Sequence, residues 1–242
     1  GITPYEMRDV INDLKAFCRQ WDITLCGCHT EITDAVTRPV VTGMMAGTVA
    51  RHNLIYKRNM APGDRVLLTK GVAVEGTAII AREFGDRLEQ KGISRNEIDH
   101  CCQFLDRISI ITEAKIAAEN PGTSAMHDVT EGGLAAALVE LSIAGKHNIK
   151  VNMNQIPVSP QTQKICDLLD IDPLGLIGSG SLLICCHNAD SEELMQRIDA
   201  AGVEITSIGE VSDKGQEIQA YKGKKQVSWP TFEVDEITKL FE

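Results

Sequence analysis

The spacing of apolar residues predicts an amphipathic helix at the start of the chain. The residues that share one helix face are Met7, Val10, Ile11, Leu14, Phe17 and Cys18. Thr3 is a favourable N-cap, Pro4 suits the first helical position, and Glu6 stands where a capping box needs an acid. We therefore expect a helix that begins at Pro4 and ends near Trp21.

The residues that follow this helix read as strands. Residues 23–28 form a short β-rich run, and residues 36–49 form a longer one that contains Gly43 and Gly47. The sequence Ala-Pro-Gly-Asp at residues 61–64 is a strong turn signal. We place a domain boundary at this turn, between residues 1–60 and 61–242.

Strands and helices alternate after the turn. Strands are expected at residues 65–70, 124–129, 149–153, 181–186, 204–211 and 217–221. Helices are expected at residues 74–90, 95–108 (after a Ser94–Glu97 capping box), 112–119, 133–145, 160–169, from a Ser191 cap to 201, and 234–241. This alternation predicts an α/β fold in which helices and a sheet form layers (α+β layered).

Charge and composition exclude several classes of protein. The net charge is −10, and residues 61–242 alone carry 17 basic against 28 acidic residues, which argues against nucleic-acid binding. No apolar run approaches the roughly 20 residues of a membrane span, and no signal peptide is evident. We expect a cytoplasmic protein with no membrane or nucleic-acid partner.

The eight cysteines show no CxxC spacing, which favours reduced cysteines used as small apolar residues. Cys185 and Cys186 are neighbours in a predicted strand and should point to opposite faces. Cys26 and Cys28 would share one strand face, and they keep open an alternative reading as a metal or redox protein.

The segment from Cys26 to Asp34 is the first candidate for chemistry. His29, Glu31 and Asp34 follow the predicted strand at residues 23–28, and Thr30 lies among them. Carboxylate and hydroxyl oxygens suit Mg²⁺, which prefers oxygen ligands and phosphate co-ligands. The alternative is a polar turn whose side chains bond nearby backbone.

The segment Met126–Gly133 is the second candidate. A short strand delivers Asp128 and then Thr130, and Gly132 and Gly133 open an apolar helix. Free amides at a helix N-terminus bind phosphate, and Asp128 could hold a cation beside it. The alternative is a helix cap followed by glycines used for tight packing. The Gly-Ser-Gly turn at residues 178–180 is a weaker signal, and motifs for P-loop, hydrolase and Rossmann sites are absent.

Taken in order, these motifs resemble a known family. The segments that carry the resemblance are His-Thr-Glu at 29–31, Val-Val-Thr-Gly at 40–43, Gly-Asp-Arg-Val-Leu-Leu-Thr-Lys at 63–70, Met-His-Asp-Val-Thr-Glu-Gly-Gly-Leu at 126–134, Asp-Pro-Leu at 172–174, Ser-Gly-Ser-Leu-Leu at 179–183 and Ile-Gly-Glu-Val at 208–211. They resemble the aminoimidazole ribonucleotide (AIR) synthase, or PurM, superfamily over nearly all of residues 20–212. The segment at 126–134 is most similar to the HypE-like hydrogenase maturation branch.

The resemblance implies an ATP- and Mg²⁺-dependent enzyme that activates a carbonyl or amide oxygen by phosphorylation. Residues 1–60 would be the tail of the ATP-binding N-terminal domain, which pairs in a homodimer, and residues 61–242 a PurM/HypE-like C-terminal domain. By position, Glu31 and Asp128 would be catalytic. The metal ligands would be Glu31, Asp34 and Asp128, and the nucleotide or phosphate would contact His29, Thr30, Thr130, Gly132 and Gly133. A maturation partner protein is a further expectation.

Departures from the family leave alternatives open. The glycine-rich segment and Asp-Asp pair of the family are absent, and the chain ends in Lys-Leu-Phe-Glu where HypE ends in a cysteine. The start Gly-Ile-Thr-Pro favours a fragment that would turn over ATP poorly by itself. The alternatives are a non-catalytic maturation scaffold of the same fold, and a selenophosphate synthetase-like or other kinase of the superfamily.

Overall fold

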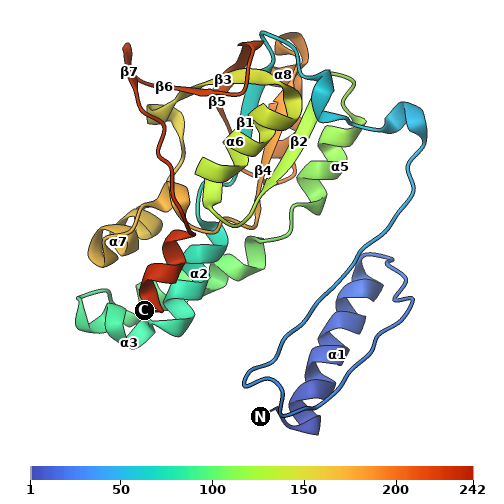
Figure 1. Cartoon of the computed structure of the whole chain (residues 1–242), viewed down its shortest axis with the longest axis vertical. Coiled ribbons are helices and arrows are strands. Elements are labelled where there is room, and N and C mark those ends of the chain that lie inside the picture. Colours follow the sequence, from blue (N-terminus) through green and yellow to red (C-terminus); the bar gives the residue numbers. More distant parts are fainter. Residues whose placement is uncertain (1, 242) are drawn as a thin grey trace. The chain divides into compact units, whose positions relative to one another are not determined.

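The computed structural model describes residues 2–241, which divide into two compact units, one up to Val49 and one from Ala50 onward. Figure 1 shows both units, which are described separately below. The predicted boundary at residue 60, and the reading of residues 1–60 as the tail of a nucleotide domain, stay predictions.

The N-terminal unit contains the predicted helix, α1 (Pro4–Gln20). The Thr3 hydroxyl accepts a hydrogen bond from the Glu6 amide at 3.3 Å, and the Glu6 carboxylate accepts one from the Thr3 amide at 2.7 Å. Trp21 ends the helix, and its amide donates to the carbonyl oxygen of Phe17 at 3.2 Å. The predicted capping box and both helix ends are confirmed.

The prediction of strands at residues 23–28 and 36–49 is wrong. These residues form no strand, and Figure 1 shows them as coil. A strand needs a neighbour that accepts and donates its backbone hydrogen bonds, and the described residues of this unit offer no such partner. Side chains that suit a buried sheet therefore remain exposed, among them Val41 at 76% and Met44 at 95%.

The second unit is built on a seven-stranded sheet in the order β2-β4-β1-β5-β3-β6-β7. The strands are β1 (Arg65–Thr69), β2 (Thr123–Val129), β3 (His147–Asn152), β4 (Ser181–Cys186), β5 (Ile205–Lys214), β6 (Ile218–Lys222) and β7 (Lys225–Val227). Neighbours run antiparallel except β3 and β6, which are parallel. The short strand β7 was not predicted.

Helices cover both faces of the sheet. They are α2 (Val74–Glu83), α3 (Gly85–Gln90), α4 (Arg95–Cys102), α5 (Ile111–Glu119), α6 (Gly133–Gly145), α7 (Pro160–Leu169) and α8 (Asn188–Ala200). Short 3-10 turns are η1 (Arg51–Asn53), η2 (Lys57–Asn59), η3 (Gln103–Arg107), η4 (Met153–Gln155), η5 (Pro173–Gly175) and η6 (Glu236–Leu240). The alternation confirms the layered α/β fold.

Strand β1 shows how the sheet separates two cores. Val66 and Leu68 face the larger core, which α6 closes with Leu134 and Leu138. Leu67 faces the smaller core, which contains residues of α5 and α8. All three β1 side chains are fully buried, which is the arrangement of a central strand with helices on both sides.

Cys185 and Cys186 confirm the same alternation on β4. Cys185 belongs to the larger core and Cys186 to the smaller one, and both are fully buried. These two cysteines act as small apolar residues.

The turn at residues 61–64 is confirmed. The Asp64 amide donates to the carbonyl oxygen of Ala61 at 3.0 Å, and the Asp64 carboxylate accepts from the Ala61 amide at 3.0 Å. Gly63 takes a positive φ of 93°, which glycine adopts without strain.

Four helix predictions need correction. The helix expected at 95–108 ends at Cys102, and residues 103–107 form the separate 3-10 turn η3. The helix expected at 74–90 divides at Phe84, whose φ of −120° ends α2 before α3 begins. Helix α8 begins at Asn188 rather than after a Ser191 cap, because the Ser191 hydroxyl donates to the Asn188 carbonyl inside the first turn. The terminal helix expected at 234–241 is the shorter turn η6. Among the described residues, no helix is both long and apolar enough to cross a bilayer.

Candidate functional site

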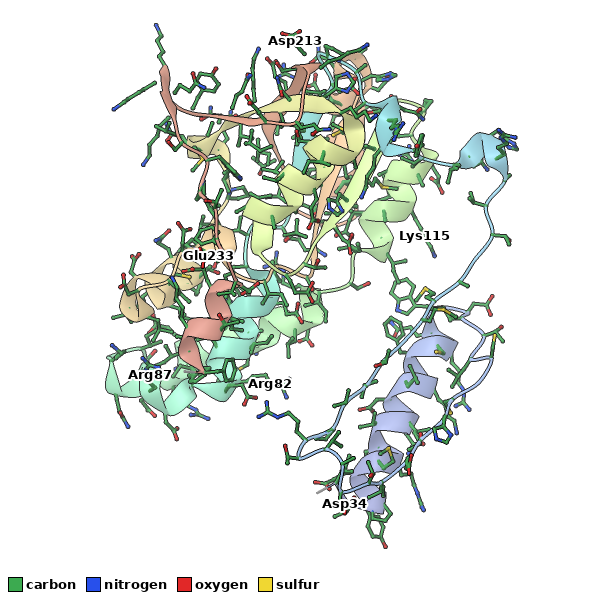
Figure 2. All side chains as sticks on the ribbon, in the orientation of Figure 1. Asp34, Arg82, Arg87, Lys115, Asp213 and Glu233 are labelled. Carbon is green, nitrogen blue, oxygen red and sulfur yellow. The ribbon has the colours of Figure 1, made fainter. Side chains whose placement is uncertain are left out.

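The first candidate segment lies in the N-terminal unit. His29, Thr30 and Glu31 are exposed, and they line a pocket of about 380 Å³ together with apolar residues of α1. Asp34 lies further along the same coil (Figure 2) and is outside this pocket lining. Within residues 2–241, no group of three His, Cys, Asp or Glu side chains is arranged to hold a metal ion. The segment therefore presents separate oxygen donors and no assembled metal centre.

Asp128, from the second candidate segment, lies on the edge strand β2, where its side chain is 59% exposed. Among residues 2–241, the β2 backbone pairs with β4 alone, and Asp128 is opposite Leu182 in that ladder. The carboxylate lies 3.5 Å from Nδ1 of His127. Asp128 is thus an accessible carboxylate on a fixed strand, as its predicted metal role requires.

His127 lies in a hydrogen-bonded chain that joins three elements. Its Nδ1 is 3.1 Å from Nζ of Lys57 on η2, and its Nε2 is 2.9 Å from a carboxylate oxygen of Glu140 on α6. An ammonium group can only donate, so Nδ1 accepts and Nε2–H donates to Glu140. This arrangement fixes the imidazole ring beside Asp128.

The amides of Gly132 and Gly133 are not free. The Gly132 amide donates to the Asp235 carboxylate at 2.7 Å, and the Gly133 amide donates to the Thr130 carbonyl at 3.1 Å. The premise of the phosphate prediction, that these amides lack partners, is therefore corrected. Binding of phosphate at this turn stays a prediction.

Close packing around residue 133 explains why this position is a glycine. A Cβ there would lie 2.5 Å from the Leu174 carbonyl oxygen and 2.6 Å from that of Leu176. Its φ of 61° also lies in the region that glycine adopts without strain. The alternative reading of this segment, glycines used for tight packing, accounts for Gly133.

Asp235 connects the two glycine-containing turns and was missed by sequence reasoning. One of its carboxylate oxygens accepts the Gly132 amide, and the other accepts the amides of Ile177 at 3.2 Å and Ile237 at 2.9 Å. Glu236 beside it accepts the Asp172 amide at 2.9 Å. An Asp before a short helical turn signals a local cap, but nothing in the sequence reveals partners far away in the chain.

A buried ion pair was also missed. Nζ of Lys70 lies 2.7 Å from a carboxylate oxygen of Glu113, and their side chains are 7% and 1% exposed. The same ammonium donates to the carbonyl oxygens of Arg107, Ser109 and Gly180. These contacts join the end of β1 to the loops that contain Arg107, Ser109 and Gly180.

The buried cysteines are poor nucleophiles. Burial raises the pKa of the Cys101 thiol to about 11, and it raises those of Cys166 and Cys186 to about 12. Burial also raises the pKa of Cys185. Only the thiolate attacks, so these groups are chemically quiet near neutral pH.

The fold and the ordered motifs define a class of protein. Residues 61–221 match the C-terminal domain of AIR synthase related proteins, and the chain belongs to that family.

Individual relatives are hydrogenase maturation proteins. The chain is 28% identical over 241 residues to the carbamoyl dehydratase HypE of Cupriavidus necator. The matched region covers 95% of this chain and 65% of that protein. It is 22% identical over 234 residues to a hydrogenase expression/formation protein of Methanocaldococcus jannaschii, with 95% of this chain and 67% of that protein covered. The chain thus spans about two thirds of the length of these relatives.

The fold is also that of solved HypE structures. The crystal structure of Escherichia coli HypE superposes with a TM-score of 0.59 at 22% identity, covering 75% of this chain and 54% of that one. A HypE structure in complex with ATP superposes with a TM-score of 0.54 at 16% identity, covering 75% of this chain and 54% of that one. A HypE–HypF complex superposes with a TM-score of 0.53 at 19% identity, covering 72% of this chain and 55% of the matched chain.

Proposed function

We propose that this chain is part of an ATP-dependent, HypE-like enzyme of hydrogenase maturation that activates a carbonyl or amide oxygen by phosphorylation. The observation that carries the proposal is similarity to HypE along 95% of the chain, together with a matched family domain at residues 61–221. A HypE structure in complex with ATP supports the choice of nucleotide.

The donor chemistry of the candidate residues fits Mg²⁺. Mg²⁺ bound with ATP keeps several waters and takes one or two carboxylates besides the phosphate oxygens, so it does not need an all-protein cage. Glu31 and Asp34 in the first unit and Asp128 in the second are exposed carboxylates that could serve in this way. The metal would supply positive charge that stabilises the transferring phosphoryl group.

The remaining residues would orient the nucleotide. His29 and Thr30 present exposed polar groups in the N-terminal unit, and the Thr130 hydroxyl lies directly after β2. Gly132 and Gly133 would bind phosphate only if their amides exchanged the acceptors that they have in this structure. Glu31 in the first unit and Asp128 in the second are each proposed as catalytic residues, because an exposed carboxylate is able to bind a cation beside a phosphate group.

The proposed partners follow from the relatives. A HypE–HypF complex supports a maturation partner protein for this chain as well. We further propose a homodimer formed through the N-terminal domain, and a cytoplasmic location.

Calorimetry of the complete gene product with ATP and Mg²⁺ tests the proposal. Glu31→Ala and Asp128→Ala should each weaken nucleotide binding at least tenfold, which corresponds to about 1.4 kcal/mol. Asp213→Ala is a matched control, because this exposed carboxylate lies near the end of β5 (Figure 2) and has no proposed role. Absence of ATP binding, or binding that neither variant changes, would overturn the enzyme reading.

A non-catalytic maturation scaffold is the second candidate. The observation in its favour is that the Gly132 and Gly133 amides already have acceptors within the chain. A scaffold would bind its partner protein without ATP, and neither Glu31→Ala nor Asp128→Ala would change that affinity. A selenophosphate synthetase-like or other kinase would instead bind ATP and fail to act on a carbamoyl substrate.

A further inference from the structure

Two of the cysteines differ from the others in their surroundings. Cys26 and Cys28 are exposed, whereas Cys18, Cys101, Cys166, Cys185 and Cys186 are buried and Cys102 is partly buried. The nucleotide chemistry proposed above uses neither exposed thiol. Among the described residues they are therefore the two cysteines whose thiols are classed as exposed.

The spacing of the two thiols permits a bond between them. Alpha carbons two residues apart are separated by at most roughly 7 Å, and a disulfide needs about 4.4–6.8 Å, so a modest bend brings the sulfurs together. The intervening residue is Gly27, which bends more readily than any other residue. A Cβ at Gly27 would meet no atom within 4 Å, so no neighbouring group blocks movement there.

The backbone around the pair is free of the restraint that a sheet would impose. Residues 23–32 form no helix or strand. The Cys26 thiol donates to a local acceptor, the Thr24 carbonyl oxygen, at 3.6 Å, and Cys28 lines the pocket beside α1. Ring closure between the two sulfurs would therefore break no ladder hydrogen bond of the described structure.

We infer that Cys26 and Cys28 form a redox-active dithiol that closes to an intrachain disulfide by exchange with small-molecule disulfides. The thiolate of one cysteine attacks a low-molecular-mass disulfide, forms a mixed disulfide and releases one thiol. The second cysteine then attacks the protein-bound sulfur, closes the ring and releases the second thiol. In total, two protein thiols are oxidised and one small disulfide is reduced to two thiols. This inference does not depend on the proposed ATP chemistry.

The small ring makes the disulfide easy to reduce. Strained or exposed disulfides have higher reduction potentials than structural ones. The pair should therefore respond to thiol–disulfide mixtures that leave structural disulfides oxidised. This reversibility distinguishes a redox site from a permanent crosslink.

The test is to equilibrate the full chain in mixtures of reduced and oxidised glutathione, quench with acid, and label the remaining thiols for mass spectrometry. The peptide that contains both thiols should lose two hydrogen atoms and take up no label as the mixture becomes more oxidising. The other six cysteines should remain reduced. Cys26→Ser and Cys28→Ser should each stop at the mixed disulfide with glutathione.

Two further variants make the result decisive. Gly27→Val, at a position where a Cβ would meet no atom within 4 Å, should shift closure to more oxidising mixtures because a β-branched residue resists the bend. Cys102→Ser should change nothing, since Cys102 is not part of the pair. Stable mixed disulfides on both cysteines, disulfide-linked dimers, or oxidation of Cys101 and Cys102 in step with the pair would each overturn the inference.

Discussion

The carboxylate of Asp235 accepts a hydrogen bond from the amide of Gly132 at 2.7 Å, across 103 positions of sequence. The same side chain accepts the Ile177 amide from a third part of the chain. A single acid near the end of the chain thereby satisfies the N-terminus of α6 and the turn that precedes β4. Stability of the second unit should therefore depend on this residue more than its position near the terminus suggests.

Removing the Asp235 carboxylate should destabilise the protein. Asp235→Ala leaves the amides of Gly132 and Ile177 without their acceptor, and we expect a loss of about 2–4 kcal/mol in the free energy of unfolding. Asp235→Asn keeps one amide oxygen and should lose less. Urea denaturation followed by circular dichroism measures both, and Asp213→Ala serves as the control. Equal stability of Asp235→Ala and Asp213→Ala would contradict the role assigned to Asp235.

Removing one partner of the buried Lys70–Glu113 ion pair should reduce the free energy of unfolding more than replacing both partners by apolar residues. Lys70→Met or Glu113→Leu each leaves one buried charge unpaired, and we expect a loss of about 3–5 kcal/mol. The double variant Lys70→Met/Glu113→Leu removes both charges and should be clearly more stable than the sum of the single losses predicts. A double-mutant cycle of thermal unfolding measures the difference, and strict additivity would show that the two groups do not interact.

Two glycines with the same backbone conformation allow packing and strain to be separated. Gly133 and Gly223 have φ values of 61° and 63°, but a Cβ would collide with the Leu174 carbonyl only at Gly133. Substitution by Ala at either position carries the left-handed strain of roughly 1–2 kcal/mol. Gly133→Ala should lose about 1–3 kcal/mol more, because overpacking is added. The two variants are compared by chemical denaturation, and matching losses would exclude the packing role.

The Glu97 carboxyl should titrate far below its usual range. Hydrogen bonds from Lys164 and Ser94 lower its pKa from 4.5 to about 2. A lowered folded-state pKa means that the stabilising contribution is complete above about pH 4.5 and is lost as pH falls towards 2. Lys164→Met should raise this pKa, whereas Lys150→Met, which removes an ammonium group that pairs with Glu210, should not. Side-chain carbon NMR over an acid titration gives both values, and an unchanged Glu97 pKa in Lys164→Met would refute the assignment.

Local signals predicted local structure well. The Thr3 and Ser94 capping boxes, the turn at residues 61–64 and the alternation on β4 depend on residues within a few positions of one another, and all were confirmed. Strand pairing depends on partners that may lie anywhere. The same β-rich composition therefore formed β1 between two neighbours and only coil at residues 36–49.

The residues of the candidate site likewise include some that short motifs indicate and others whose contacts depend on the tertiary structure. Motif reasoning proposed Asp128 because short motifs reveal which groups are chemically able to act, and the structure shows that its side chain is exposed. It could not reveal that Asp235 accepts the Gly132 amide, because that contact exists only after folding has brought distant segments together. Amide availability, and therefore phosphate binding, depends on tertiary partners that short motifs do not specify.

The position of β1 in the sheet sets the order in which the second unit can form. Arg65–Thr69 pairs with Ser181–Cys186 on one side and Ile205–Lys214 on the other, so both partners of this interior strand are synthesised more than a hundred residues later. During translation the apolar side chains of Val66, Leu67 and Leu68 emerge without a sheet to enter. Long-range pairing of this kind is slow and leaves strand edges open to aggregation. We therefore expect fragments that end before Ile205, which lack β5, to accumulate as insoluble protein.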